Sequence, residues 1–197
     1  GLDINLEGSP SSDIYSVDSP ATFAIKPTDI KGLVPKMNVK QDDEVMAGDC
    51  LFTDKKNERI CFTAPVSGKI AEVVRGDRRA ILAVKIVVDS TVSFKSFDTS
   101  GYATKTAEEL KELLLASGLW PFIVQRPFGV LADSSVTPKA IHVSGFDSAP
   151  LAADASITLK GEEANLKAGF DVLKKLTSGK VHLNLHSAKD SSIYAAV

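Results

Sequence analysis

The first part of the chain alternates hydrophobic and polar residues over short stretches and shows no helical period. Residues 2–6 carry the period-2 pattern of a half-buried strand, and a second short strand is expected over 21–25. From Gly32 to Val88, glycine, aspartate and proline separate further hydrophobic runs, which is typical of an all-β module. These runs predict strands over 34–39, 45–46, 51–53, 60–63, 69–74 and 80–88.

The second half of the chain alternates helices with strands. A helix is expected from Thr106, a candidate N-cap, to Gly118, which suits a helix C-terminus. Beyond it the periodicity predicts a strand over 140–144, a helix over 162–176 and a strand over 181–186. A strand, a long helix and a strand in succession are typical of a parallel sheet. Two strands are few for such a sheet, so we expect this domain to continue beyond Val197.

These patterns predict an α+β or α/β protein with two parts. Residues 1–92 hold the N-terminal strands and a β module, whose core covers about 28–90, and residues 93–197 hold a linker and an α/β domain. With 23 Lys and Arg against 25 Asp and Glu, the composition argues against disorder and against a basic nucleic-acid surface. Two cysteines are too few for a disulfide framework and favour a reducing compartment. The most apolar stretch, 113–124, is shorter than the about 20 residues that a bilayer requires, and the first residues predict no signal peptide.

The strongest local pattern lies between Val39 and Gly68. It reads Val-x-x-x-Asp-x-Val-x-x-Gly-x-x-Leu from Val39, and then Ala-Pro-Val-Ser-Gly from Ala64. Glycine and aspartate suit tight turns, and the proline suits an edge strand. The pattern resembles the biotinyl/lipoyl carrier family, in which two antiparallel sheets form a flattened barrel. Asp42 stands where that family prefers glycine.

The carrier resemblance implies that Lys55 corresponds to the lysine that carries biotin or lipoate. The separation from Lys55 to Gly68 is 13 residues, longer than expected for the modified hairpin, and Lys56, Glu58 and Arg59 add charge to the tip. A modifying enzyme recognises the position of the lysine at the turn, so a shifted register abolishes modification. We therefore expect a solvated, charged hairpin with an unmodified Lys55.

The cysteines and histidines predict no metal site. Cys50 and Cys61 flank the same hairpin without a Cys-x-x-Cys partner, and we interpret them as buried small hydrophobic residues. His182 and His186 fall on the polar face of a strand, with no nearby Glu or Cys to complete a ligand set. His142 lies in an apolar strand, and we interpret it as a hydrogen-bonded core residue.

A nucleotide site is not expected either. The turn after the strand at 140–144 has the sequence Ser-Gly-Phe-Asp-Ser-Ala-Pro, which lacks the Gly-x-Gly-x-x-Gly motif and any Gly-Lys-Ser/Thr. Too few backbone N–H groups could then approach a pyrophosphate. We predict that this chain does not bind NADH, and we assign it no catalytic, cofactor-binding or metal-binding residue.

Two segments are candidate contacts with a partner. One is the basic turn Arg-Gly-Asp-Arg-Arg, which is either a solvated loop or a docking contact for an acidic partner. The other is an aromatic loop, which either fills the interface between the domains or anchors a partner. The residues concerned are Arg75, Arg78, Arg79, Trp120, Phe122, Arg126 and Phe128.

Further motifs extend a second resemblance over nearly the whole chain. In order they are Gly1-Leu2-Asp3-Ile4, Asp54-Lys55-Lys56-Asn57, Phe62-Thr63-Ala64-Pro65, Arg75-Gly76-Asp77-Arg78-Arg79, Ser117-Gly118-Leu119-Trp120, Arg126-Pro127-Phe128 and Asp147-Ser148-Ala149-Pro150. This ordered set resembles the N-terminal part of the A subunit in the bacterial sodium-translocating NADH:quinone oxidoreductase family.

The resemblance implies a barrel-sandwich hybrid joined to a partial Rossmann-like domain that has lost its nucleotide. It also implies a peripheral protein on the cytoplasmic side of the inner membrane, in a complex that transfers electrons from NADH to ubiquinone or menaquinone and exports sodium. NADH, flavins, iron centres and quinone would belong to the complex, and the membrane-embedded subunits would be the main partners. This fragment is then expected to be a non-catalytic scaffold, with any quinone contact beyond Val197.

Two alternatives remain at this stage. One is the C subunit of an Rnf-type electron-transfer complex, which shares the carrier-like and Rossmann-like plan and would carry iron–sulfur cysteines farther on. The other is a biotin or lipoate carrier, which an added mass on Lys55 would reveal.

Overall fold

The computed structural model describes residues 7–8, 11–149, 151–187, 190–195 and 197. The strand expected over 2–6 therefore lies outside the described residues. Contacts divide the chain into two compact units, one formed by residues 18–101 and 108–135 and the other by residues 136–197 with 102–107 and the chain before residue 18. Among the described residues, no helix combines the length and apolar character needed to cross a bilayer.

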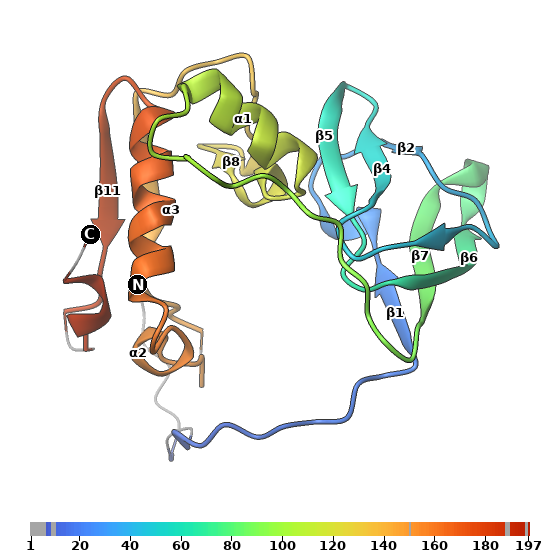
Figure 1. Ribbon diagram of the computed structural model, residues 1–197, viewed down its shortest axis with the longest axis horizontal. Coiled ribbons are helices and arrows are strands. Elements are labelled where there is room, and N and C mark those ends of the chain that lie inside the picture. The colour runs from blue at the N-terminus through green and yellow to red at the C-terminus, as the bar shows by residue number, and fades with distance from the viewer. Residues whose placement is uncertain (1–6, 9–10, 150, 188–189, 196) are drawn as a thin grey trace. The chain divides into compact units, whose positions relative to one another are not determined.

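The first unit contains a sandwich of two antiparallel sheets (Figure 1). One sheet has the order β1-β7-β6-β3 and the other the order β2-β4-β5. The bounds are β1 Thr22–Ile25, β2 Pro35–Met37, β3 Glu44–Val45, β4 Cys50–Asp54, β5 Asn57–Thr63, β6 Gly68–Arg75 and β7 Ile81–Val88, with short 3-10 turns at Pro27–Asp29 and Asp77–Arg79. Every strand predicted within this module from residue 21 onward is confirmed.

The core of the sandwich consists of apolar side chains from strands of both sheets. Leu51, Phe52, Ile70, Val84 and Ile86 are fully buried, as the hydrophobic positions of two facing sheets must be. Phe52 also stacks on its cross-strand partner Phe62 within this core, with ring centroids 4.9 Å apart. The expected barrel-sandwich architecture is thereby confirmed.

Helix α1, Ala107–Ala116, ends as its sequence indicates. Gly118 has a φ of +76°, and the Leu119 N–H donates to the Leu114 carbonyl at 3.1 Å, which is the closing hydrogen bond of a Schellman cap. Leu110 and Leu115 bury the apolar stripe of the helix. Arg59 of β5 forms ion pairs with two glutamates on the helix, Glu108 and Glu112. These contacts attach α1 to the β sandwich within the same unit.

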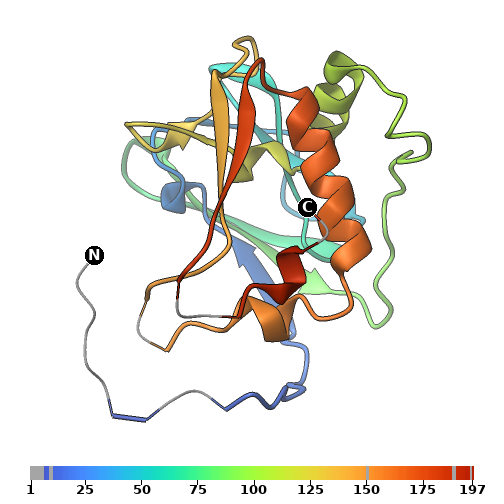
Figure 2. The ribbon, with the colours of Figure 1, turned by 90° about the vertical axis from the view of Figure 1, so that its left-hand side faces the viewer.

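The second unit contains the predicted strand–helix–strand arrangement. Its elements are β10 Ala140–Ser144, α2 Ala155–Thr158, α3 Glu163–Lys175, β11 Lys180–Asn184 and a 3-10 turn at Ser192–Tyr194. Strands β10 and β11 pair in parallel, with Ala140 opposite Lys180. Figure 2 shows the two strands side by side with α3 running along them.

His142 corrects one expectation about this sheet. The period-2 alternation of β10 places Ile141 and Val143 on one face and His142 on the other. His142 is exposed there and stacks on His182 of β11, with ring centroids 4.7 Å apart. The interpretation of His142 as a core residue is therefore wrong. The apolar residues of this strand, Ile141 and Val143, point to the opposite face of the sheet.

Candidate functional site

The β4–β5 hairpin brings Lys55 to the first position of a two-residue turn, between the paired residues Asp54 and Asn57. The Lys55 N–H donates to the Val34 carbonyl at 2.8 Å, and the Lys56 N–H donates to the Asp54 carboxylate at 3.1 Å. The Lys55 side chain is exposed. The turn therefore presents one lysine to solvent from a fixed backbone.

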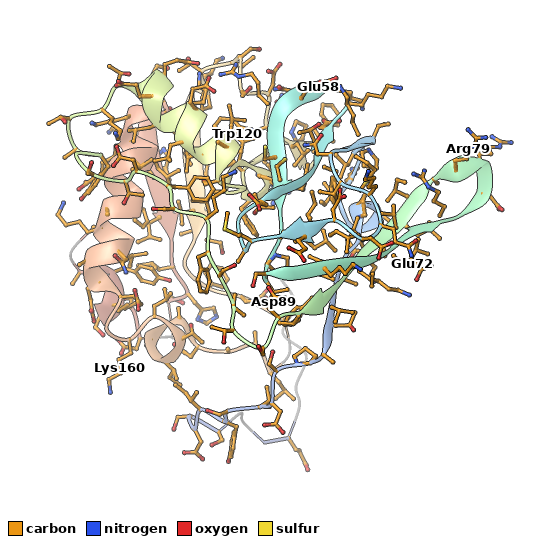
Figure 3. The ribbon with its side chains drawn as sticks, turned by 45° about the vertical axis from the view of Figure 1, so that its right-hand side comes forward. Glu58, Glu72, Arg79, Asp89, Trp120 and Lys160 are labelled. Carbon is orange, nitrogen blue, oxygen red and sulfur yellow. The ribbon has the colours of Figure 1, made fainter. Side chains whose placement is uncertain are left out.

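The side chains around this turn bind the hairpin to its surroundings. Lys56 Nζ donates to the Gly32 carbonyl at 3.1 Å, and Asn57 Nδ2 donates to the hydroxyl of the buried Ser134 at 2.9 Å. Glu58, labelled at the end of the hairpin in Figure 3, pairs with a lysine of β2 at 2.6 Å. Of these contacts, the one between Asn57 and Ser134 joins the hairpin to the segment that follows α1.

The basic turn lies at the tip of the β6–β7 hairpin, where Figure 3 shows Arg79 projecting from the ribbon. Arg75, Arg78 and Arg79 are all exposed, and within the described part of the chain none of their side chains has an ion pair or hydrogen bond. Arg78 and Arg79 have φ values of 54° and 62°, a left-handed backbone conformation that is energetically costly for residues other than glycine. The tip therefore presents three cations on a backbone that is held in an unfavourable conformation.

The aromatic segment separates into a buried part and an exposed part. Trp120 is only 5% exposed, and its indole N–H donates to the Ala132 carbonyl at 2.9 Å. In Figure 3 it lies beside α1. Phe122 and Phe128 are 82% and 68% exposed, and Arg126 is also exposed. Trp120 thus fills the interior of its own unit, whereas the other three side chains present an apolar and cationic surface.

This segment is also more regular than the loop that the sequence predicted. It contains a 3-10 turn at Trp120–Phe122 and a short hairpin formed by β8, Val124–Gln125, and β9, Val130–Leu131. The Gly129 N–H closes the hairpin by donating to the Gln125 carbonyl at 2.9 Å. Strands of two residues are too short to produce a periodic signal, which explains why the pattern did not reveal them.

In the second unit, the turn after β10 is covered by its own chain. A Cβ atom added at Gly145 would lie 2.8 Å from a methyl carbon of Leu185 and 3.0 Å from the ring of Tyr194. The Tyr194 hydroxyl donates to the Gly145 carbonyl at 3.0 Å, and burial raises the pKa of Tyr194 above its usual value. In nucleotide-binding α/β folds, this turn is where the backbone approaches a pyrophosphate. Here a tyrosine occupies that approach.

The two cysteines belong to the first unit and the three histidines to the second. Cys50 and Cys61 are half-buried free thiols, so their interpretation as buried hydrophobic residues is wrong. His186 falls beyond the end of β11 and meets the ring of Phe146 edge-on at 5.5 Å. No cluster of three or more residues suited to metal binding occurs in the part of the chain that the structure describes.

Comparisons with known proteins agree with this arrangement. Residues 1–89 match the family model described as the NqrA N-terminal barrel-sandwich hybrid domain, and residues 105–196 match the NqrA second alpha/beta domain. The chain belongs to the NqrA family. The resemblance drawn from the sequence motifs is thus confirmed, while the predicted domain boundary at residues 92 and 93 stays a prediction.

Several NqrA relatives are named as the A subunit of a Na(+)-translocating NADH-quinone reductase. The relative from Neisseria meningitidis serogroup B is 36% identical over 185 residues, which cover 93% of this chain and 41% of that protein. The relative from Actinobacillus pleuropneumoniae serotype 5b is 35% identical over 195 residues, or 98% of this chain and 43% of that protein. The relative from Serratia proteamaculans is 37% identical over 187 residues, or 93% of this chain and 42% of that protein. The chain thus spans about two fifths of the length of these relatives.

Proposed function

We propose that this chain supplies the first two domains of the NqrA protein in a sodium-translocating NADH:quinone reductase. The observation that carries the proposal is the match of both NqrA domain models, in order, along one chain. In this proposal the protein is peripheral, lies on the cytoplasmic side of the bacterial inner membrane, and belongs to a complex that passes electrons from NADH to quinone and exports sodium. The same match favours NqrA over the C subunit of an Rnf-type complex.

Within that complex we propose that these two domains serve as a non-catalytic scaffold. Two features support this role. The hairpin that carries a cofactor in biotinyl and lipoyl proteins is hydrogen-bonded to Ser134, beyond α1, which suits a module held in place better than a mobile carrier domain. The turn that holds a nucleotide in Rossmann-like folds is covered by Tyr194. In this proposal the flavins, iron centres and quinone of the complex are held outside these two domains.

We propose that the scaffold contacts its partners through two surfaces of the first unit. The arginine tip is defined by Arg75, Arg78 and Arg79, and the phenylalanine surface by Phe122, Arg126 and Phe128. Unpaired arginines at a projecting tip suit an acidic patch, because electrostatic attraction guides docking and fixes its orientation. Exposed phenylalanines suit an apolar pocket, since aromatic side chains supply much of the energy of protein interfaces. We expect the membrane-embedded subunits to provide both the acidic patch and the apolar pocket.

Affinity purification of the assembled complex tests this proposal. Full-length NqrA carrying Arg75→Glu, Arg78→Glu and Arg79→Glu should recover the other subunits at least about fivefold less well than the unchanged protein, because charge reversal turns attraction into repulsion. Lys160→Glu is the control for a single charge reversal away from the tip, since Lys160 is an exposed lysine of the second unit. Full recovery of the other subunits with the triple variant would show that the arginine tip is not part of the interface. Normal assembly without residues 1–197 would refute the scaffold role altogether.

A further inference from the structure

The two cysteines of the chain are neighbours across the β4–β5 hairpin. Cys50 is opposite Thr63, and Cys61 is opposite Thr53, so the register puts both cysteines on one face of the paired strands, diagonal to each other. Cys50 Sγ accepts a hydrogen bond from the Asn38 amide at 3.3 Å and donates one to the Phe52 carbonyl at 3.4 Å, and a hydrogen bond between the two thiols is the largest influence on the pKa of both. Both thiols are half-buried and reduced, so small reagents have access to them.

The surroundings of Cys50 favour its thiolate. The hydrogen bond from Cys61 lowers the pKa of Cys50 most, and burial opposes this effect. The Asn38 amide, whose Nδ2 lies 3.3 Å from Cys50 Sγ, the Phe62 backbone N–H and the charge of Lys95 lower the pKa further, to about 7. The pKa of Cys61 is raised above its usual value by the same hydrogen bond to Cys50 and by burial. At neutral pH one sulfur of the pair is therefore a nucleophile and the other a protonated neighbour.

We propose that Cys50 and Cys61 form a peroxide-sensitive pair that closes an intramolecular disulfide. In the first step the Cys50 thiolate attacks hydrogen peroxide, a sulfur–oxygen bond forms, the oxygen–oxygen bond breaks, and hydroxide leaves with the electron pair of that bond. Cys50 is thereby oxidised to a sulfenic acid, and the departing hydroxide takes up a proton to become water. Cys61 then loses its proton and attacks the sulfenic sulfur, and the hydroxyl group leaves as a second water.

The order of these steps follows from the geometry of the pair. Cys50 starts the reaction because the Asn38 amide, the Phe62 N–H and Lys95 stabilise negative charge on its sulfur. Cys61 is the resolving thiol because it lies diagonally across from Cys50 on the adjacent strand, so closure joins two side chains that share one face of the hairpin. A small dithiol would return the pair to its reduced form. The site is separate from the arginine tip and does not depend on the proposed function.

Mass spectrometry of the 197-residue chain tests the proposal directly. After reduction and brief exposure to hydrogen peroxide, the monomer should lose the mass of two hydrogen atoms, and peptide mapping should find Cys50 linked to Cys61. Cys61→Ser should instead accumulate a sulfenic acid on Cys50 that dimedone traps, whereas Cys50→Ser should give little dimedone adduct in the same time. Two free thiols after exposure, a disulfide that joins two chains, or equal trapping in both variants would overturn the proposal.

Alkylation kinetics give a second measurement that does not require oxidation. With iodoacetamide, the rate at Cys50 should rise through a midpoint near pH 7, because the thiolate is the reacting form. At pH 7, Cys50 should react at least about tenfold faster than Cys61. Asn38→Ala removes one donor and should move the midpoint for Cys50 to higher pH. Equal rates at the two cysteines, or a midpoint near that of a free cysteine, would contradict the assigned roles.

Discussion

Gly68, the last residue of the carrier-like motif, occupies a position where the backbone leaves no room for a side chain. It begins β6, pairs with Val88 of β7, and has a φ of +155°. An added Cβ would run into the backbone carbonyl of Val87, which cannot move without breaking the strand pairing. We predict that Gly68→Ala lowers the free energy of unfolding of the first unit by at least about 2 kcal/mol. Chemical denaturation followed by the fluorescence of Trp120, the single tryptophan, measures this.

Gly169 is the matched control for that substitution. It lies inside α3, and nothing lies within 4 Å of a Cβ added there. Alanine has the higher helix propensity, so Gly169→Ala should stabilise the second unit by about 0.5–1 kcal/mol. A loss of stability at both positions would show that the cost at Gly68 does not come from the close approach of Val87.

Single residues also show where inference from sequence succeeds and where it fails. Asp42 stands where the carrier family prefers glycine, and it adopts a φ of +73°, a conformation that aspartate tolerates better than most residues. The turn was therefore predictable from the motif. The contact between Cys50 and Cys61 was only partly predictable, since the hairpin brings them near each other but strand register decides whether their side chains share a face.

At the scale of elements, Lys175 shows how a helix end organises a connecting segment. Its ammonium group, on the last residue of α3, donates to the carbonyls of Ala103 at 2.6 Å, Lys105 at 2.8 Å and Tyr102 at 3.4 Å. A hydrogen bond from a charged donor contributes more to stability than a neutral one does. Replacing Lys175 with alanine removes all three of these hydrogen bonds. We predict that Lys175→Ala destabilises the second unit by about 1–2 kcal/mol.

Hydrogen exchange of the amides in α3 and β11 measures this loss of stability. Lys174 is the control, because it is exposed and its one partner among the described residues is Asp171, at 3.4 Å. Lys174→Ala should change the stability by less than about 0.5 kcal/mol. If the two variants exchanged at the same rate, the carbonyl contacts of Lys175 would carry no stability.

The elements that the sequence predicted are those with a repeated pattern. The strands of the β module and the β10–α3–β11 arrangement follow from periodicity, because each buries one face over several residues. Helix α2, with four residues, and the β8–β9 hairpin, with two residues in each strand, are too short to carry a period. The β8–β9 hairpin instead has a contact distant in sequence, since Lys31 Nζ donates to the Phe128 carbonyl at 2.7 Å, 97 residues away. No local pattern encodes such a contact.

At the scale of the whole molecule, the scaffold proposal depends on the absence of a nucleotide site, and two physical reasons support that absence. The turn after β10 lacks the glycines that would bring backbone N–H groups to a pyrophosphate. Tyr194 and Leu185 also cover the backbone of this turn at Gly145. The first reason concerns the groups that would bind phosphate, and the second concerns access to the turn. A substitution of Tyr194 changes the access and leaves the binding groups unchanged, so it distinguishes the two reasons.

We predict that NADH fluorescence shows no saturable change on titration with the unchanged chain or with Tyr194→Ala. The variant removes the tyrosine from above Gly145 but leaves Leu185 and a turn without the N–H groups that hold phosphate, so this change alone should not create a site. Circular dichroism on the variant checks that the parallel pair and α3 stay folded. Saturable binding by the variant alone would show that the Tyr194 side chain, and not a lack of binding groups, prevents NADH from binding at this turn. Binding by the unchanged chain would contradict the scaffold role, because the second domain would then hold the substrate that supplies electrons to the complex.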